Sequence, residues 1–231
     1  MPHGDLEEVF PDVFVVTGTS RPNFMGADWQ FSRNMTVIRE GRSLTLVNTV
    51  RLDDERLTEL ASLGDVEHIV RLGAFHGMDD GFYKDRFSRA RLWALPKMAH
   101  LHGLVTDEVL APSGKLPFAN GSIFAFETSA HPEGILHLDR EGGILVSCDS
   151  LQNWVEADRY FDEASATKMA EIGFLRAANV GPGWLAGCSP QRSDFVRLRA
   201  MSFRHLLSAH GRPLRNEAHG MLSKRFDELG L

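Results

Sequence analysis

Short apolar runs separated by turn residues dominate the first fifty positions of the chain. Val13–Thr17, Met35–Arg39 and Ser43–Val47 are rich in β-branched residues, and Glu40-Gly41-Arg42 joins the last two runs. Runs of this length and composition predict strands, and a short connection that contains glycine predicts a hairpin. The chain is therefore expected to begin as an antiparallel sheet.

The next stretch alternates between helical and extended patterns. In order, the sequence predicts a helix capped by Asp53 or Asp54 and ended by Gly64, a strand at Val66–Leu72, a helix at Phe82–Ala90 and a strand at Arg91–Leu95. The last three elements form a β-α-β unit. Residues 97–120 show no clear periodicity and are expected to form a long loop.

The second half repeats the order of strands followed by helices. Its predicted elements are strands at 122–128, 134–139 and 144–148, helices at 159–173 and 193–204 with a break at Gly181-Pro182-Gly183, a strand at 205–208 and a closing helix at 216–229. No linker rich in glycine, serine or charge separates the two halves. We therefore expect one α+β domain over residues 1–231, with two packed sheets and helices outside them.

Charge and hydropathy exclude several classes of partner. The chain of 231 residues carries a formal net charge of −6 with a pI near 5.9, and neutralising nucleic-acid phosphates requires a basic face. No stretch approaches the ~20 apolar residues of a bilayer span, and the start MPHGDLEEVF lacks the features of a signal peptide. We expect a cytoplasmic protein that binds a small molecule, and neither nucleic acid nor membrane.

The two cysteines, Cys148 and Cys188, are far from any Cys-x-x-Cys spacing. Neither a disulfide framework nor a thiolate zinc cluster is indicated. Two free thiols are expected, with Cys148 as a small buried apolar residue rather than a nucleophile.

Metal-capable side chains follow four predicted strands or turns. They are His76 in FHGMDDG, His131 in SAHPEG, Asp149 in LVSCD and His210 in LLSAHG. A single histidine at such a place is usually a core or surface residue. Four in succession, where loops gather catalytic groups, favour a common site.

With these segments in this order, the chain resembles the metallo-β-lactamase superfamily, whose fold is a four-layer αββα sandwich. The first family motif, His-x-His-x-Asp-His, can be laid on residues 76–81, where His76 and Asp80 match. Met78 and Gly81 stand where the motif has two further histidines. The resemblance covers nearly the whole chain from about Val13.

The resemblance extends to three later segments. His131 with Gly134 matches the third-motif histidine, Asp149 matches the bridging aspartate with Cys148 in the usual glycine position, and His210-Gly211 matches the last histidine. It implies two incomplete ligand sets that share one carboxylate: His76, His131 and Asp149 for a first ion, and Asp80, His210 and Asp149 for a second.

Because each set has lost one imidazole, the five surviving side chains can instead converge on a single ion. Two or three imidazoles with one or two carboxylates suit zinc, and also iron or manganese. A bound ion makes hydroxide available at neutral pH to attack an ester, thioester, lactone or related centre. Asp80 is the candidate to orient that water or take its proton, with Asp79 as the competing carboxylate.

A rival interpretation is a non-catalytic protein of the same fold that has lost its metal and binds a small molecule or a protein partner, as the substitutions at Met78 and Gly81 suggest. A generic α+β domain whose histidines happen to end strands is a third. The loops at Arg21–Phe31 and Lys97–Asn120 are expected to set specificity. In the first of these loops, Phe24, Met25 and Trp29 can form an apolar lip over the site or merely cover the sheet.

Overall fold

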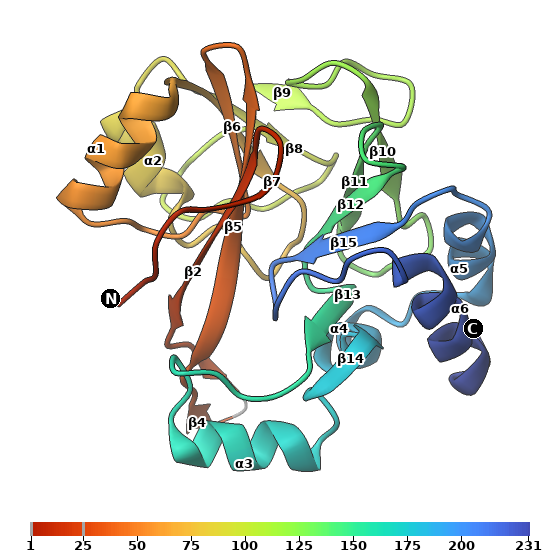
Figure 1. Cartoon of the computed structure of the whole chain (residues 1–231). Coiled ribbons are helices and arrows are strands. Elements are labelled where there is room, and N and C mark those ends of the chain that lie inside the picture. The colour runs from red at the N-terminus through yellow and green to blue at the C-terminus, as the bar shows by residue number, and fades with distance from the viewer. Residues whose placement is uncertain (1, 25) are drawn as a thin grey trace.

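Two β-sheets packed face to face form the centre of the molecule (Figure 1). The computed structural model describes residues 2–24 and 26–231. The first sheet has the strand order β1-β2-β5-β6-β7-β8-β9, formed by Glu7–Phe10, Val13–Ser20, Phe31–Glu40, Ser43–Val47, Asp65–Arg71, Arg91–Ala94 and Glu108–Val109. The second has the order β10-β11-β12-β15, formed by Gly121–Ala125, Gly134–Leu138, Ile144–Ser147 and His205–Ser208.

Smaller elements complete the fold. Two further strand pairs are β3 with β4, at Asn23–Phe24 and Ala27–Asp28, and β13 with β14, at Leu151–Trp154 and Arg176–Val180. The helices are α1 to α6, at Asp54–Leu63, Asp80–Arg86, Glu163–Glu171, Pro182–Cys188, Arg192–Arg199 and Ala218–Glu228.

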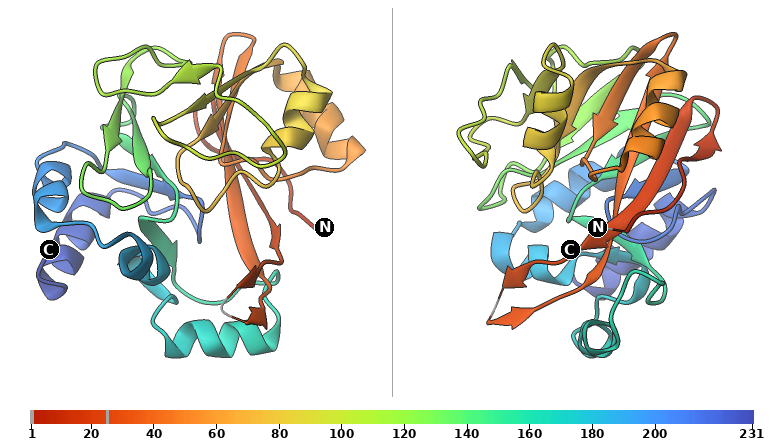
Figure 2. Two further views of the ribbon diagram at one scale, coloured as in Figure 1. Left: turned by 180° about the vertical axis from the view of Figure 1, so that it is seen from behind. Right: turned by 90° about the vertical axis from the view of Figure 1, so that its left-hand side faces the viewer.

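Helices α1 and α2 cover the outer face of the first sheet, and α5 and α6 cover that of the second, whereas α3 lies at one end of the molecule (Figure 2). Leu57 and Leu60 of α1 and Tyr83 of α2 join the apolar core on the first sheet. Phe195 of α5 and Phe226 of α6 join the core on the second sheet. The predicted α+β, four-layer αββα sandwich is therefore confirmed.

A third apolar core lies between the sheets and binds them together. Val70 and Trp93 of the first sheet pack in one cluster with Leu136, Val146 and Leu207 of the second. These side chains are at most a few per cent exposed. Burial of apolar surface on both faces of the second sheet explains why β12, with the sequence ILVS, is a nearly continuous apolar run.

One connection in the second sheet determines where the functional residues meet. β12 and β15 are parallel neighbours, with Ser147 opposite Ser208 in the register. Parallel neighbours need a long crossover, and here it contains α3, α4 and α5. Because both strands end at the same edge, Asp149 and His210 emerge side by side.

The predicted elements differ from the structure mainly between residues 149 and 190. Leu151–Trp154 is a strand although it contains two polar residues, because the buried amide of Asn153 accepts a hydrogen bond from Ala178 N–H and donates one to the Arg212 carbonyl. Pro182 begins α4 instead of breaking the chain, since proline at the first helical position loses no hydrogen bond. None of the helices formed by the described residues has the length and apolar character of a bilayer span.

Asp194, in the first turn of α5, fastens the helix to the loop after β10. Its carboxylate accepts hydrogen bonds from the backbone N–H groups of Glu127 and Thr128 and is paired with Arg197. Burial raises the pKa of Asp194, but the hydrogen bonds from Thr128 and Arg197 outweigh it, and the net pKa lies below the ordinary value of 3.8.

We predict that Asp194→Asn lowers the free energy of unfolding by about 2 kcal/mol at pH 7, because hydrogen bonds to a charged acceptor are lost. A depressed folded-state pKa contributes stability that is present above pH 3.8 and lost as pH falls through the folded value. The difference between wild type and variant should therefore shrink at pH 3. Urea unfolding at pH 7 and at pH 3 measures this difference in the free energy of unfolding.

Asp227→Asn is the matched control, because this carboxylate is exposed and forms a surface ion pair with Arg199. Its effect should stay below about 0.5 kcal/mol. An equal loss in both variants, or a difference for Asp194→Asn that does not change with pH, would contradict the assignment.

Candidate metal centre

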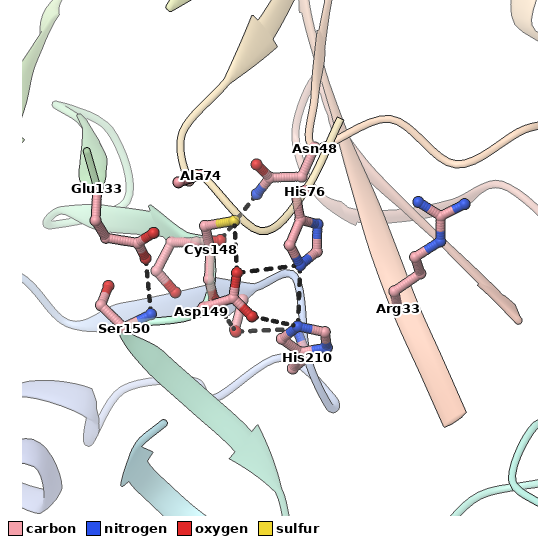
Figure 3. A network of polar contacts seen from close by, with 12 residues as sticks. Arg33, Asn48, Ala74, His76, Glu133, Cys148, Asp149, Ser150 and His210 are labelled. Carbon is pink, nitrogen blue, oxygen red and sulfur yellow. Dashed lines mark hydrogen bonds and ion pairs between the residues drawn. The ribbon is translucent and has the colours of Figure 1, made fainter. Parts of the chain in front are cut away.

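Three strand ends deliver His76, Asp149 and His210 to one point between the sheets (Figure 3). His76 Nε2 lies 3.0 Å from His210 Nε2, and His210 Nε2 lies 3.0 Å from Asp149 Oδ1. His76 Nε2 lies 3.4 Å from Asp149 Oδ2. Each of the three side chains therefore has a ligand atom within 3.4 Å of a ligand atom on each of the other two.

These distances fit the ligand shell of a metal ion. Zinc–ligand distances of about 2.0–2.2 Å place neighbouring ligand atoms about 3.3 Å apart in a tetrahedron. Two imidazole nitrogens and one carboxylate oxygen are a donor set for zinc and also for iron. Three such ligands would leave a position open.

The electrostatics of the cluster keep Asp149 ionised and His210 neutral. Burial alone would raise the pKa of Asp149, but the neighbouring His76 and the hydrogen bonds from His210 and His76 bring it well below its usual range. Burial lowers the pKa of His210. A carboxylate and a neutral imidazole are the forms that bind a metal ion.

Cys148 offers a further donor next to this cluster. Ligand atoms of His76, Cys148 and Asp149 lie within 4.8 Å of one another, and Cys148 Sγ donates to Asp149 Oδ2 at 3.5 Å. Burial raises the pKa of the Cys148 thiol well above its ordinary value. The shorter contacts of His210 therefore make it the better third ligand.

Asp80, at the start of α2, lies outside this cluster. Its Oδ1 accepts a hydrogen bond from the Thr49 hydroxyl at 2.7 Å, and its buried Oδ2 has no hydrogen-bond partner among the described residues. Burial raises the pKa of Asp80, against the hydrogen bond from Thr49 and the charge of Arg71. No hydrogen bond within the described chain joins Asp80 to His76, Asp149 or His210.

His131, like Asp80, is a predicted ligand that the structure does not bring to the cluster. Its side chain is exposed, and its ring packs edge-on against Phe75 at a centroid distance of 5.5 Å. The expectation that all five residues meet in one pocket is not met by His131 and Asp80, and their roles as metal ligands stay predictions. Met78, at a lost histidine position, is likewise exposed.

In this segment the buried side chain is that of Glu133, two residues after the exposed His131. Its segment pairs with Gly73, and its Oε1 accepts from the Ser150 N–H at 2.7 Å (Figure 3). Burial and the nearby charge of Asp149 raise the pKa of Glu133 well above its ordinary value. Glu133 is thus a buried acid of raised pKa next to the charged Asp149.

A cavity of about 440 Å³ opens beside the cluster. His76, Asp149 and His210 form part of its wall, and Asp80 does not line it. Most of the remaining wall is aromatic or thioether. Any molecule in this cavity would therefore meet the two imidazoles and Asp149 directly.

Solved structures with the same arrangement of sheets and helices were found by comparison of folds. The metallo-β-lactamase from Hirschia baltica is 14% identical, with 96% of each chain covered and a TM-score of 0.60. DIM-1 metallo-β-lactamase is 12% identical over 99% of this chain and 100% of its own, with a TM-score of 0.66. FIM-1 from Pseudomonas aeruginosa, in its mono-zinc form, is 12% identical over 100% and 97%, with a TM-score of 0.59.

This chain has the metallo-β-lactamase fold. Neither a protein-family model nor a curated protein matches its sequence. At this level of identity the likeness shows the fold alone. The order of motifs along the chain, which resembles that of the metallo-β-lactamase superfamily, thus agrees with the fold of the chain.

Within the metallo-β-lactamase fold, this chain carries a buried arginine beneath the loop that presents His76. The Arg71 guanidinium donates to the carbonyls of Gly73 and Ala74 at 3.2 and 2.7 Å, and its charge acts against the burial that raises the pKa of Asp80. Gly77, with φ +93°, leaves it room, because a Cβ there would lie 2.7 Å from the guanidinium. Arg71 therefore holds the loop in place and compensates the charge of Asp80.

A second buried arginine, Arg33, binds the competing carboxylate. Arg33 pairs with Asp79 and donates to the Thr49 carbonyl at 3.2 Å. Asp79 is thereby committed to an ion pair and cannot act in place of Asp80. The same Thr49 contacts Asp80 through its hydroxyl, so the two arginines and two aspartates form one network.

Sequence reasoning missed Arg71, Arg33 and Glu133. The signal for Arg71 was a single charge between Val70 and Leu72 in an apolar strand, which is a place where a charge must be compensated. For Glu133 there was only its position two residues after His131. Nothing local indicated which of the two would point inward.

We predict that Arg71→Met lowers the free energy of unfolding by about 3 kcal/mol or more, because it leaves Asp80 buried without a compensating charge. Arg71→Met/Asp80→Asn should recover part of the loss, since the uncompensated carboxylate is gone. Urea unfolding of the chelator-treated protein measures both. Additive effects of the two substitutions would contradict the pairing of Arg71 with Asp80.

Proposed function

We propose that this protein is a metal-dependent hydrolase with a single-ion centre held by His76, Asp149 and His210. What supports the proposal is the mutual approach of their ligand atoms to 3.0–3.4 Å at the wall of a cavity. Zinc is the ion that the donor set suits best, with iron or manganese as alternatives. The mono-zinc form of FIM-1 is a one-ion example in this fold.

The substrate class that fits is a small ester, thioester or lactone. A bound metal ion would supply a water of lowered pKa and would polarise the carbonyl. In the hydrolysis, the water oxygen bonds to the acyl carbon, the bond from that carbon to oxygen or sulfur breaks, and the leaving group takes the proton that the water loses. Asp149 lines the cavity, so its carboxylate is available to orient the reacting water.

We assign Asp80 a supporting role in this proposal. Its contacts are to Thr49 and Arg71, and it does not line the cavity. A group that takes a proton from water must reach that water directly or through one other molecule. Asp80 is thus proposed to hold the loop of His76 rather than to act on the substrate.

The alternative function is a metal-free binding protein on the same scaffold. The observation that favours it is the direct contact between His76 and His210 at 3.0 Å, which lets the imidazoles and Asp149 satisfy one another. Metal binding distinguishes the two functions, because the alternative requires none.

We predict that chelator-treated protein binds about one equivalent of zinc in titration calorimetry. His210→Ala should lower the affinity by more than about 100-fold, because loss of a direct ligand costs more than the 10–100-fold lost with an outer-shell partner. His131→Ala is the matched control and should change the affinity by less than about threefold, since that ring is exposed and rests on Phe75.

Two outcomes would contradict the single-ion proposal. If the wild type binds no zinc, iron or manganese, the metal-free alternative holds. If His131→Ala weakens binding as much as His210→Ala does, the loop moves on metal binding and His131 is a ligand after all.

A further inference from the structure

The cavity beside the cluster is lined by aromatic rings from distant parts of the chain. They are Trp29, Phe31, Phe75, Trp154, Phe174 and Trp184. Figure 1 shows β4 and α3 together at one end of the molecule. The sequence predicted that Phe24, Met25 and Trp29 form an apolar lip over the site or cover the sheet. Trp29 lines the cavity. Met25 and the side chain of Phe24 lie outside the described residues.

The aromatic wall is continuous with the metal centre. The Trp154 ring lies 4.4 Å from the His210 ring, and Phe31 packs edge-on against Trp154 at 5.7 Å. A compound that fills the cavity would therefore place one end against His210. Aromatic side chains of this kind bind flat apolar groups by dispersion and edge-to-face contact.

The charged side chains in the wall already have polar partners within the protein. Arg33 is paired with Asp79, and Asp149 lies against His76 and His210. The other polar side chains, Ser20 and Gln152, are uncharged. A negatively charged group entering the aromatic part would lose its hydration and meet the ionised Asp149, and no unpaired cation is found among the described residues that line the cavity, so the penalty is large.

The mouth of the cavity is apolar as well. Phe75 and Met78 are 47% and 40% exposed and both line the cavity. Exposed apolar side chains that rim a cavity mark a surface that meets an apolar ligand. A volume of about 440 Å³ lies within the range of about 300–1,000 Å³ of small-molecule sites.

We propose that this cavity takes the acyl part of an uncharged, aromatic carboxylic ester or thioester, with the carbonyl at the metal centre. The choice of substrate rests on the proposed hydrolase function, whereas binding to the aromatic wall does not require the metal. Hydrolysis of the model ester methyl 2-naphthoate would join the water oxygen to the acyl carbon, break the acyl–oxygen bond and give 2-naphthoic acid and methanol.

The four tryptophans provide a direct test in nitrogen-15 protein, prepared without metal so that no turnover occurs. Trp29, Trp154 and Trp184 line the cavity. Trp93 does not, and its indole donates to His68 at 3.1 Å, so its signal is an internal control. Methyl 2-naphthoate should shift the three cavity indole signals and leave that of Trp93 in place.

Sodium 2-naphthoate is the matched charged probe. We expect it to bind at least about tenfold more weakly than the ester, because its carboxylate must be desolvated. Equal or tighter binding of the anion would overturn the preference for an uncharged ligand. Absence of shifts up to the solubility limit of the ester, or equal shifts of Trp93, would overturn the site itself.

Two exposed positions provide matched variants that spare the core. Met78→Glu adds a charge at the cavity mouth and should weaken ester binding about fivefold or more. Val196→Glu adds the same charge on α5, where Val196 is 56% exposed and away from the cavity wall, and should have no effect. Equal effects of the two would overturn the placement of the ester.

The zinc titration keeps this inference separate from the proposed function. If the protein binds the ester but not zinc, the cavity proposal is supported and the hydrolase function is contradicted. If it binds zinc but not the ester, the metal centre is supported and the cavity proposal is contradicted. If both bind, the zinc-loaded protein should hydrolyse methyl 2-naphthoate faster than methyl acetate, which leaves the aromatic wall empty. Faster turnover of methyl acetate would overturn the substrate class.

Discussion

The parallel pairing of β12 with β15 is the constraint on which the candidate site depends. It aligns Ser147 with Ser208 and brings the next residues of each strand out at one edge. Asp149 and His210 are 61 positions apart in the sequence, yet their side chains meet at 3.0 Å because of this register. His76 reaches the same point from the opposite sheet, so the centre bridges the two halves of the sandwich.

The buried charges around this point are arranged so that few remain uncompensated. Asp79 is paired with Arg33, Asp80 faces Arg71, and Thr49 contacts both groups. Glu133 has no cationic partner among the described residues, and burial and the charge of Asp149 raise its pKa well above the ordinary value. The ionised Asp149 and its two imidazoles are thereby left as the candidate metal ligands at the cavity wall.

The cluster and the cavity wall also differ in polarity. The cluster contains polar atoms that satisfy one another or a metal ion, whereas the cavity wall is mostly aromatic. Loop segments without regular structure supply Trp29 and Phe75 to that wall. The polar cluster and the apolar cavity wall thus lie next to each other but differ in the groups that they can bind.

The sequence by itself determined most of the order of strands and helices, because apolar periodicity and turn residues act over a few positions, but it missed β1, β13, β14 and α4. It also determined which residues end the strands, including His76, Asp149 and His210. Only the tertiary structure decided that Glu133 rather than His131 points inward, since that depends on the pairing of the segment with Gly73. The aromatic cavity was likewise undetermined, because its rings come from segments whose spacing in the chain contains no sign of their contact in space.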